Sequence, residues 1–144
     1  MPKVLLDTWT FQQYLEDESQ LSEDAQSIIR AAVAANDHLY VSAISYLEAR
    51  LTARASGLSR HDLDSLDESL ERSRIQILPV TQWVVVSIDM IPDSATLADR
   101  IAAAQALSGN YTLLTGVEDI ICTELDCVRS NPAHMGTTEV IGSA

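Results

Sequence analysis

Residues 98–115 read ADRIAAAQALSGNYTLLT, and this stretch decides the fold class. Its first ten residues are apolar on nearly every side of a helix, which is typical of a central helix that neighbouring elements cover. Residues 108–110 end this helix, and residues 111–115 form a short apolar run that suits a strand. We therefore expect a buried helix that leads directly into a buried strand.

The same alternation extends through the chain on the N-terminal side of this unit. Short apolar runs at residues 3–6, 38–41 and 75–80 predict three more strands. Residues 84–86 favour a strand locally, but the order of elements favours a helix over residues 81–90. The helices are predicted over residues 9–15, 22–35, 43–55, 59–73, 81–90 and 96–107.

The order of these elements predicts the architecture. Strands that are separated by helices imply right-handed crossovers and a parallel sheet. The strands are mostly continuous apolar runs, as expected for a sheet that is covered on both faces. We predict an α/β three-layer sandwich, in which helices flank a central, mainly parallel sheet of four or five strands.

The length of 144 residues suits one compact domain, which we place at residues 1–130, with a C-terminal tail at residues 131–144. Apolar residues make up 47% and charged residues 21% of the chain, so disordered and collagen-like classes are excluded. No apolar run approaches the ~20 residues of a membrane span, and the N-terminus does not resemble a signal peptide. We expect a cytoplasmic protein with no membrane partner, in which Cys122 and Cys127 are structural thiols.

The charge balance restricts how the protein can meet a nucleic acid. Nine Lys and Arg residues against 21 Asp and Glu residues give a net charge of −12. This excludes a broad basic patch of the kind that holds a phosphate backbone. Carboxylates can still act on a phosphodiester when they gather divalent cations, because the metal then supplies the positive charge. The same acidity would suit a basic protein partner.

Several acids fall at the carboxyl ends of the predicted strands, where the loops of a parallel sheet converge on a site. Asp7 directly follows the first strand, Glu48 lies in the helix after the second, and Asp99 opens the Ala-rich central helix. Glu118 and Asp119 follow the fourth strand. Like charges in one half-buried cleft destabilise a fold unless a cation binds there. Oxygen ligands of this kind select Mg²⁺ or Mn²⁺ over zinc.

Each of these acids also has a purely structural interpretation. Asp7 can cap the first helix, and Glu48 can extend from the margin of its helix toward solvent. Asp99 stands three residues after Thr96, in the outline of a capping box. The two acids after the fourth strand suit the first turn of a last helix. Their common position at one end of the sheet favours the metal-site interpretation.

Four segments of the sequence, taken in order, resemble the successive motifs of PIN domains. They are LLDT at residues 5–8, VSAISYLE at 41–48, ADRIAAAQAL at 98–107 and LLT at 113–115. Within that family the chain looks most like the VapC toxins of bacterial toxin–antitoxin pairs. The resemblance implies a metal-dependent ribonuclease fold that is usually dimeric and that an antitoxin neutralises.

The resemblance also implies roles for individual residues. Asp7, Glu48 and Asp99 match three family acids that would hold Mg²⁺ or Mn²⁺, and Thr115 would orient a ligand or the attacking water. Relatives usually carry a further acid where this chain has Val117. The two acids that follow it are therefore candidate metal ligands as well.

These inferences lead to a main hypothesis and two rivals. We expect a metal-dependent endoribonuclease of the toxin type, acting on RNA as a homodimer and bound by a cognate antitoxin. Val117 leaves open a PIN-like domain with weakened catalysis that acts as a binding or scaffolding module. An unrelated small α/β hydrolase or phosphatase would need a G-x-S-x-G elbow or a P-loop, and the sequence has neither. Arg100 would face the scissile phosphate or pair with Asp99 or Glu48.

Overall fold

The computed structural model describes residues 3–55, 60–91, 96–115 and 128–130. Its strands form one sheet in the order β3-β2-β1-β4-β5, and every neighbouring pair is parallel. The predicted parallel sheet is confirmed, and its fifth strand lies in a stretch where the sequence signal is weak. The strands are β1 (Lys3–Leu6), β2 (Leu39–Ser42), β3 (Ile75–Leu78), β4 (Tyr111–Thr115) and β5 (Val128–Ser130).

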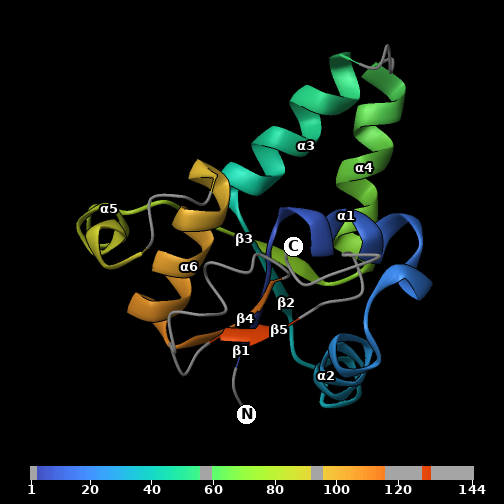
Figure 1. Ribbon diagram of the computed structural model, residues 1–144. Coiled ribbons are helices and arrows are strands. Elements are labelled where there is room, and N and C mark those ends of the chain that lie inside the picture. Colours follow the sequence, from blue (N-terminus) through green and yellow to red (C-terminus); the bar gives the residue numbers. More distant parts are fainter. Residues whose placement is uncertain (1–2, 56–59, 92–95, 116–127, 131–144) are drawn as a thin grey trace.

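Helices cover both faces of this sheet (Figure 1). They are α1 (Thr8–Glu16), α2 (Glu23–Ala34), α3 (Ala43–Ala55), α4 (Arg60–Arg72), α5 (Gln82–Ser87) and α6 (Leu97–Gly109), with two short 3₁₀ helices, η1 (Glu18–Gln20) and η2 (Ile88–Met90). The helix predicted over residues 81–90 is confirmed as α5 followed by η2. Both cysteines and the C-terminal tail at residues 131–144 fall outside the described residues.

Alternate residues of the central strand enter two separate hydrophobic clusters. On one face of the sheet, Val4 and Leu6 pack with Phe11 of α1. On the other face, Leu5 packs with Val84 of α5 and with the alanines of α6. Successive side chains of a strand point to opposite faces, so a continuous apolar strand is what a sheet covered on both faces requires. The predicted three-layer sandwich is confirmed.

α6 is the central helix that the sequence predicts. Its alanines at positions 102, 103, 104 and 106 are fully buried, and their small side chains let the helix lie close to the sheet. Asn110 ends the helix in the left-handed conformation, with φ 59°, and its N–H donates to the carbonyl of Ala106.

No helix in the described part of the chain is long and apolar enough to cross a membrane.

The carboxyl edge of the sheet is where three helices meet. β1 ends in the middle of the sheet, and the N–H of Asp7 donates to the carbonyl of Leu114 in β4 over 3.2 Å. α1 and α3 begin directly after β1 and β2. α6 precedes β4 in the chain and packs along it, so its first turn returns to the same edge.

α3 and α4 project together from the sheet (Figure 1). Arg50 of α3 joins the two helices, because its Nη1 donates to Asp67 Oδ1 over 2.8 Å. The same nitrogen donates to the hydroxyl of Tyr46 over 3.0 Å. Both partners of the ion pair are partly exposed, so this contact orients α4 more than it stabilises the fold.

Candidate active site

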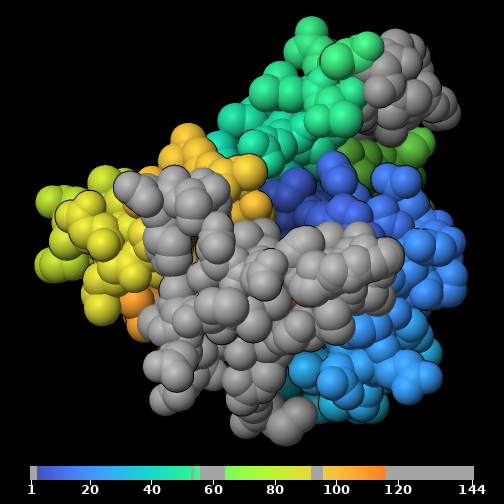
Figure 2. Space-filling view, viewed as in Figure 1, coloured from blue at the N-terminus to red at the C-terminus, as the bar shows by residue number. Residues whose placement is uncertain are grey.

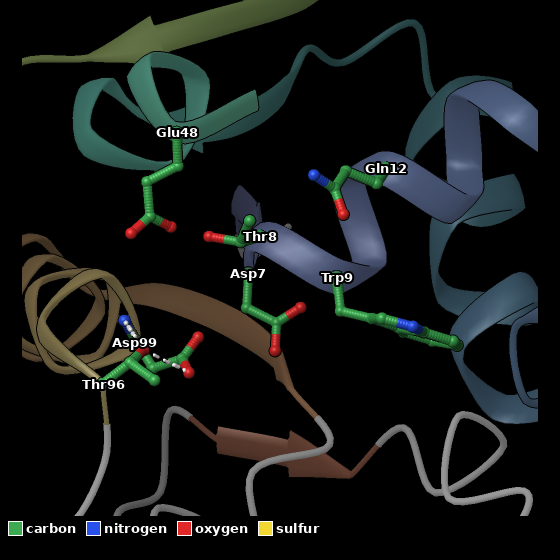
Figure 3. Close-up of a pocket in the computed structure, with 7 residues that line it drawn as sticks. All are labelled: Asp7, Thr8, Trp9, Gln12, Glu48, Thr96 and Asp99. Atoms are coloured by element: carbon green, nitrogen blue, oxygen red, sulfur yellow. Dashed lines mark hydrogen bonds between the residues drawn. The ribbon is translucent and has the colours of Figure 1, made fainter. Parts of the chain in front are cut away.

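A pocket of about 290 Å³ opens at the carboxyl edge of the sheet (Figure 3). Its walls come from the start of α1, the middle of α3 and the first turn of α6, which are far apart in the sequence. The structure thereby brings Asp7, Glu48 and Asp99 to one pocket. The lining residues are Asp7, Thr8, Trp9, Gln12, Glu48, Thr96 and Asp99.

Asp7 is the N-cap of α1 and is almost completely buried, with 2% of its surface exposed. Its Oδ1 accepts a hydrogen bond from the N–H of Thr10 over 2.8 Å, which satisfies a donor that the helix cannot pair internally. The capping interpretation is therefore confirmed. Figure 3 shows the same carboxylate facing the cavity, so capping and a role in the pocket are compatible.

Asp99 lies in the first turn of α6, whose N-cap is Thr96. The hydroxyl of Thr96 accepts from the N–H of Asp99 over 3.2 Å and donates to its Oδ2 over 2.7 Å. In a standard capping box the acid reaches back to the backbone N–H of the N-cap, whereas here it accepts from the side chain. These two bonds hold the Asp99 carboxylate beside the pocket (Figure 3).

Glu48 reaches the pocket from α3, and its half-buried side chain points toward the cavity (Figure 3). Ser45 lies one turn earlier on the same helix and is fully buried. Its hydroxyl accepts a hydrogen bond from the hydroxyl of Thr8 over 2.8 Å. This bond ties the start of α1 to α3, and it thereby positions Asp7 relative to Glu48.

The pocket is acidic, and among the described residues no Lys, Arg or His side chain lines it. Arg100, which follows Asp99 in the sequence, is not among the residues that line the pocket. Its Nη2 donates to the main-chain carbonyls of Ile88 and Ile91 over 3.4 and 3.5 Å. Carboxylates that share a partly buried site repel one another, so the pocket favours a cation.

The donor set suits a hard divalent cation, because all three acids offer carboxylate oxygens. The side chains as the structure places them do not yet form a metal site. Within residues 3–55, 60–91, 96–115 and 128–130, there is no group of three or more His, Cys, Asp or Glu side chains that could hold a metal ion. Coordination by all three acids would therefore require side-chain rotation. Glu48 is the side chain best suited to move, because it is long and only half buried.

The other predicted site residues are Thr115 and the two acids that follow the fourth strand. Thr115 is fully buried at the end of β4 and does not line the pocket. Glu118 and Asp119, together with Val117, fall outside the described residues.

Four lining residues were not predicted as part of the site, namely Thr8, Trp9, Gln12 and Thr96. Trp9 and Gln12 border the pocket from α1. The spacing carries a signal that could have found them, since residues three apart on a helix are neighbours on one face. A helix that starts directly after Asp7 therefore presents both residues beside that acid.

The comparisons with known proteins agree with this geometry. The PIN domain family model matches residues 4–121. DNA-bound VapBC from Salmonella typhimurium is similar in structure, with a TM-score of 0.69 at 16% identity over 90% of this chain and 98% of that chain. A toxin–antitoxin complex from Klebsiella pneumoniae gives 0.65 at 18% identity, over 88% and 96%. FitAcB from Neisseria gonorrhoeae gives 0.60 at 24% identity, over 91% and 98%.

At these identities the solved structures bear on the fold alone. No curated protein sequence matches the chain. The family match, however, spans most of the 144 residues and includes every element that lines the pocket. The chain belongs to the PIN domain family.

Proposed function

We propose that this protein is a Mg²⁺- or Mn²⁺-dependent endoribonuclease of the VapC toxin type, which cleaves RNA phosphodiesters in the cytoplasm. One observation carries the proposal: Asp7, Glu48 and Asp99 come from three separate elements and line one pocket in a PIN domain. Capping explains the positions of two of these acids. It does not explain why Glu48 points into the same pocket from a third helix.

In this proposal the three acids hold the metal ion, and Glu118 and Asp119 are further candidate ligands. A divalent cation bound there would supply the charge that activates water and stabilises the leaving oxygen of a phosphodiester. The residues of the chain supply orientation. Cap hydrogen bonds restrain Asp7 and Asp99, while Glu48 adjusts to the ion. Thr115 is buried at the end of β4 and does not line the pocket, so the role that the family resemblance implies for it stays a prediction.

The charge of the chain supports a basic protein partner. A net charge of −12 favours association with a positively charged surface. The structural neighbours include a toxin–antitoxin complex from Klebsiella pneumoniae. We propose a cognate antitoxin as the partner on these grounds.

A second copy of the chain is the other partner that we propose. Large apolar side chains are exposed on α5 and η2, where Trp83, Val85, Val86 and Met90 are between 58% and 77% exposed. Figure 2 shows α5, in yellow, at an outer edge of the molecule. Contiguous exposed apolar side chains are typical of a protein interface, so this face suits a homodimer contact.

The alternative is a PIN domain with weakened catalysis that acts as a binding or scaffolding module. Val117 favours it, because a valine offers no oxygen to a second metal ion. This alternative retains the fold and the partners but not the cleavage.

A cleavage assay separates the two. We would incubate a structured RNA with the wild type, Asp7→Asn and Val117→Asp, in Mn²⁺, in Mg²⁺ and in a chelator. The proposal predicts weak wild-type cleavage that is faster in Mn²⁺, no cleavage by Asp7→Asn and faster cleavage by Val117→Asp. Asp17→Asn is the matched control, since Asp17 is also an N-cap but is exposed and far from the pocket.

The opposite outcomes are equally clear. Cleavage that persists in the chelator, or that Asp7→Asn leaves at the wild-type rate, contradicts a metal site at these acids. Absence of cleavage in the wild type and in Val117→Asp, while calorimetry shows that metal binds, establishes the binding-module alternative.

A further inference from the structure

We propose that a second pocket, between α5 and the last turns of α6, binds an uncharged aromatic molecule that carries an N–H donor. The two helices lie side by side (Figure 1), and the pocket has a volume of about 340 Å³, which suits a small ligand. Its walls come from the end of β3, the start of α5, the last turns of α6 and the start of β4. It shares no described lining residue with the acidic pocket, so the inference goes beyond the proposed ribonuclease function and does not depend on it.

Gln105 of α6 gives the second pocket a hydrogen-bond acceptor that lacks a donor. The residue is 3% exposed, and its Nε2 donates to the main-chain carbonyls of Leu78 and Pro79 over 3.2 and 3.0 Å. Both of those residues line the pocket as well, so the carboxamide lies in the pocket wall. Among the described residues, no donor reaches Gln105 Oε1. Because an unpaired buried acceptor costs stability, the pocket favours a ligand that donates a hydrogen bond to this oxygen.

Two aromatic side chains border the second pocket. The ring of Tyr111 meets the ring of Tyr40 edge to face, with centroids 5.1 Å apart, and the ammonium of Lys3 lies 5.7 Å from its centroid. Gly109 is part of the same fit, because a Cβ at this position would lie 2.5 Å from Tyr111 Cε2. These contacts order the Tyr111 ring, whereas Trp83 is 77% exposed and free to adjust to a ligand. Aromatic walls of this kind favour an aromatic ligand.

The lining of the second pocket carries no formal charge. Among the described residues, no Asp, Glu, Lys, Arg or His side chain lines it, and its other polar side chains are the hydroxyls of Thr81 and Ser108. An ion that entered would lose hydration without gaining an ion pair. The net charge of −12 attracts cations to the chain as a whole, but this pocket offers them no carboxylate. The chemistry therefore selects an uncharged ligand.

Indole and N-methylindole test the donor, because they share one ring system and only indole has an N–H. Skatole, which keeps the N–H and carries the extra methyl group on carbon, controls for size. Titration of indole into the ¹⁵N-labelled full-length protein should shift the side-chain signals of Trp83 and Gln105. The signal of Trp9 should stay in place, since Trp9 lines the acidic pocket, and Trp83→Phe distinguishes the two tryptophans. Skatole should bind like indole, and N-methylindole should bind about fivefold more weakly.

Three variants assign this preference to the pocket. Gln105→Met keeps the length of the side chain but removes the amide oxygen, so it should bind indole and N-methylindole equally. Gln13→Met, on α1 and outside this pocket, should keep the preference for indole. Trp83→Ala alters an exposed side chain without disturbing the core, and it should weaken both ligands by about fivefold. Melting temperatures check that each variant is folded.

The opposite results would overturn the proposal. No shift of the Trp83 signal at the solubility limit of indole rejects the site. Equal affinity of the wild type for all three indoles, or a preference for indole that persists in Gln105→Met, rejects Gln105 as the acceptor. A Trp83 signal that moves on dilution of the protein and ignores indole shows that a second copy of the chain covers the pocket instead. None of these measurements involves RNA cleavage, so a failure here leaves the ribonuclease proposal in place.

Discussion

Asp7 uses one carboxylate for two purposes, as a helix cap and as a wall of the acidic pocket. Asp7→Asn separates them, because asparagine caps a helix about as well as aspartate but is a neutral and weaker metal ligand. Without metal, the free energy of unfolding should change by less than about 1 kcal/mol, or rise slightly as charge repulsion is relieved. At a metal concentration about 100-fold above Kd, the wild type should gain about 2.7 kcal/mol and the variant should not.

Thermal melts with and without Mn²⁺ test this prediction. Asp17→Asn should keep the full metal-induced gain, since it alters an exposed cap outside the pocket. A gain that survives in Asp7→Asn would show that the metal binds elsewhere.

Tyr14 makes the free energy of unfolding depend on pH in the alkaline range. Burial, and then the negative charge of Glu18, raise the pKa of its phenol above the ordinary value of 10.0. Its stabilising contribution is therefore complete below that value and is lost as the pH rises through the raised folded pKa. Urea unfolding at about pH 9 and about pH 11 should show a smaller loss of stability in Tyr14→Phe than in the wild type. Glu18→Gln should fall between the two, and equal losses in all three would contradict the prediction.

At the scale of elements, the Thr8–Ser45 hydrogen bond couples α1 to α3 and so couples Asp7 to Glu48. Ser45→Ala should lower the free energy of unfolding by about 1 kcal/mol, because one partly buried hydrogen bond is lost. It should also reduce the metal-induced gain in melting temperature, since the two acids are no longer held at a set spacing. Ser69→Ala is the control, because the Ser69 hydroxyl is bonded within α4 to the carbonyl of Ser65. If both variants show the same metal-induced gain in melting temperature as the wild type, the Thr8–Ser45 hydrogen bond does not position the acids.

At the scale of the whole molecule, two copies with a net charge of −12 repel each other, so association depends on apolar contact and on salt. Sedimentation equilibrium should show a tighter dimer as NaCl rises from about 0.05 M to about 0.3 M. Val86→Asp should raise the dimer Kd about tenfold or more, since it buries an unpaired charge on α5. Val33→Asp, on α2 and 49% exposed, should have little effect. An equal rise of the dimer Kd in both variants would contradict a dimer contact through α5.

The sequence by itself was enough to identify the alternating elements, the parallel sheet and the three acids at its carboxyl edge. These features follow from short-range patterns: apolar runs, helix caps and the rule that parallel strands end at one edge. The helix α5 is harder to predict from the sequence, because its consecutive valines favour a strand. The order of elements identifies it, and the structure shows why it is tolerated, since Val84 alone of the three is buried.

Only the tertiary structure decided what surrounds those acids. Arg100 lies next to Asp99 in the sequence, yet its direction depends on where η2 packs, because its Nη2 donates to the carbonyl of Ile88 in η2 and to that of Ile91, which follows η2. The spacing on α1 places Gln12 on the same helix face as Trp9, but only the packing of α1 against α3 makes it part of a pocket wall. Thr115 stands at a strand end, yet it is fully buried and does not line the pocket. Local patterns determine which elements form and which edge they reach, whereas the direction of a side chain at that edge depends on packing between elements that are distant in the chain.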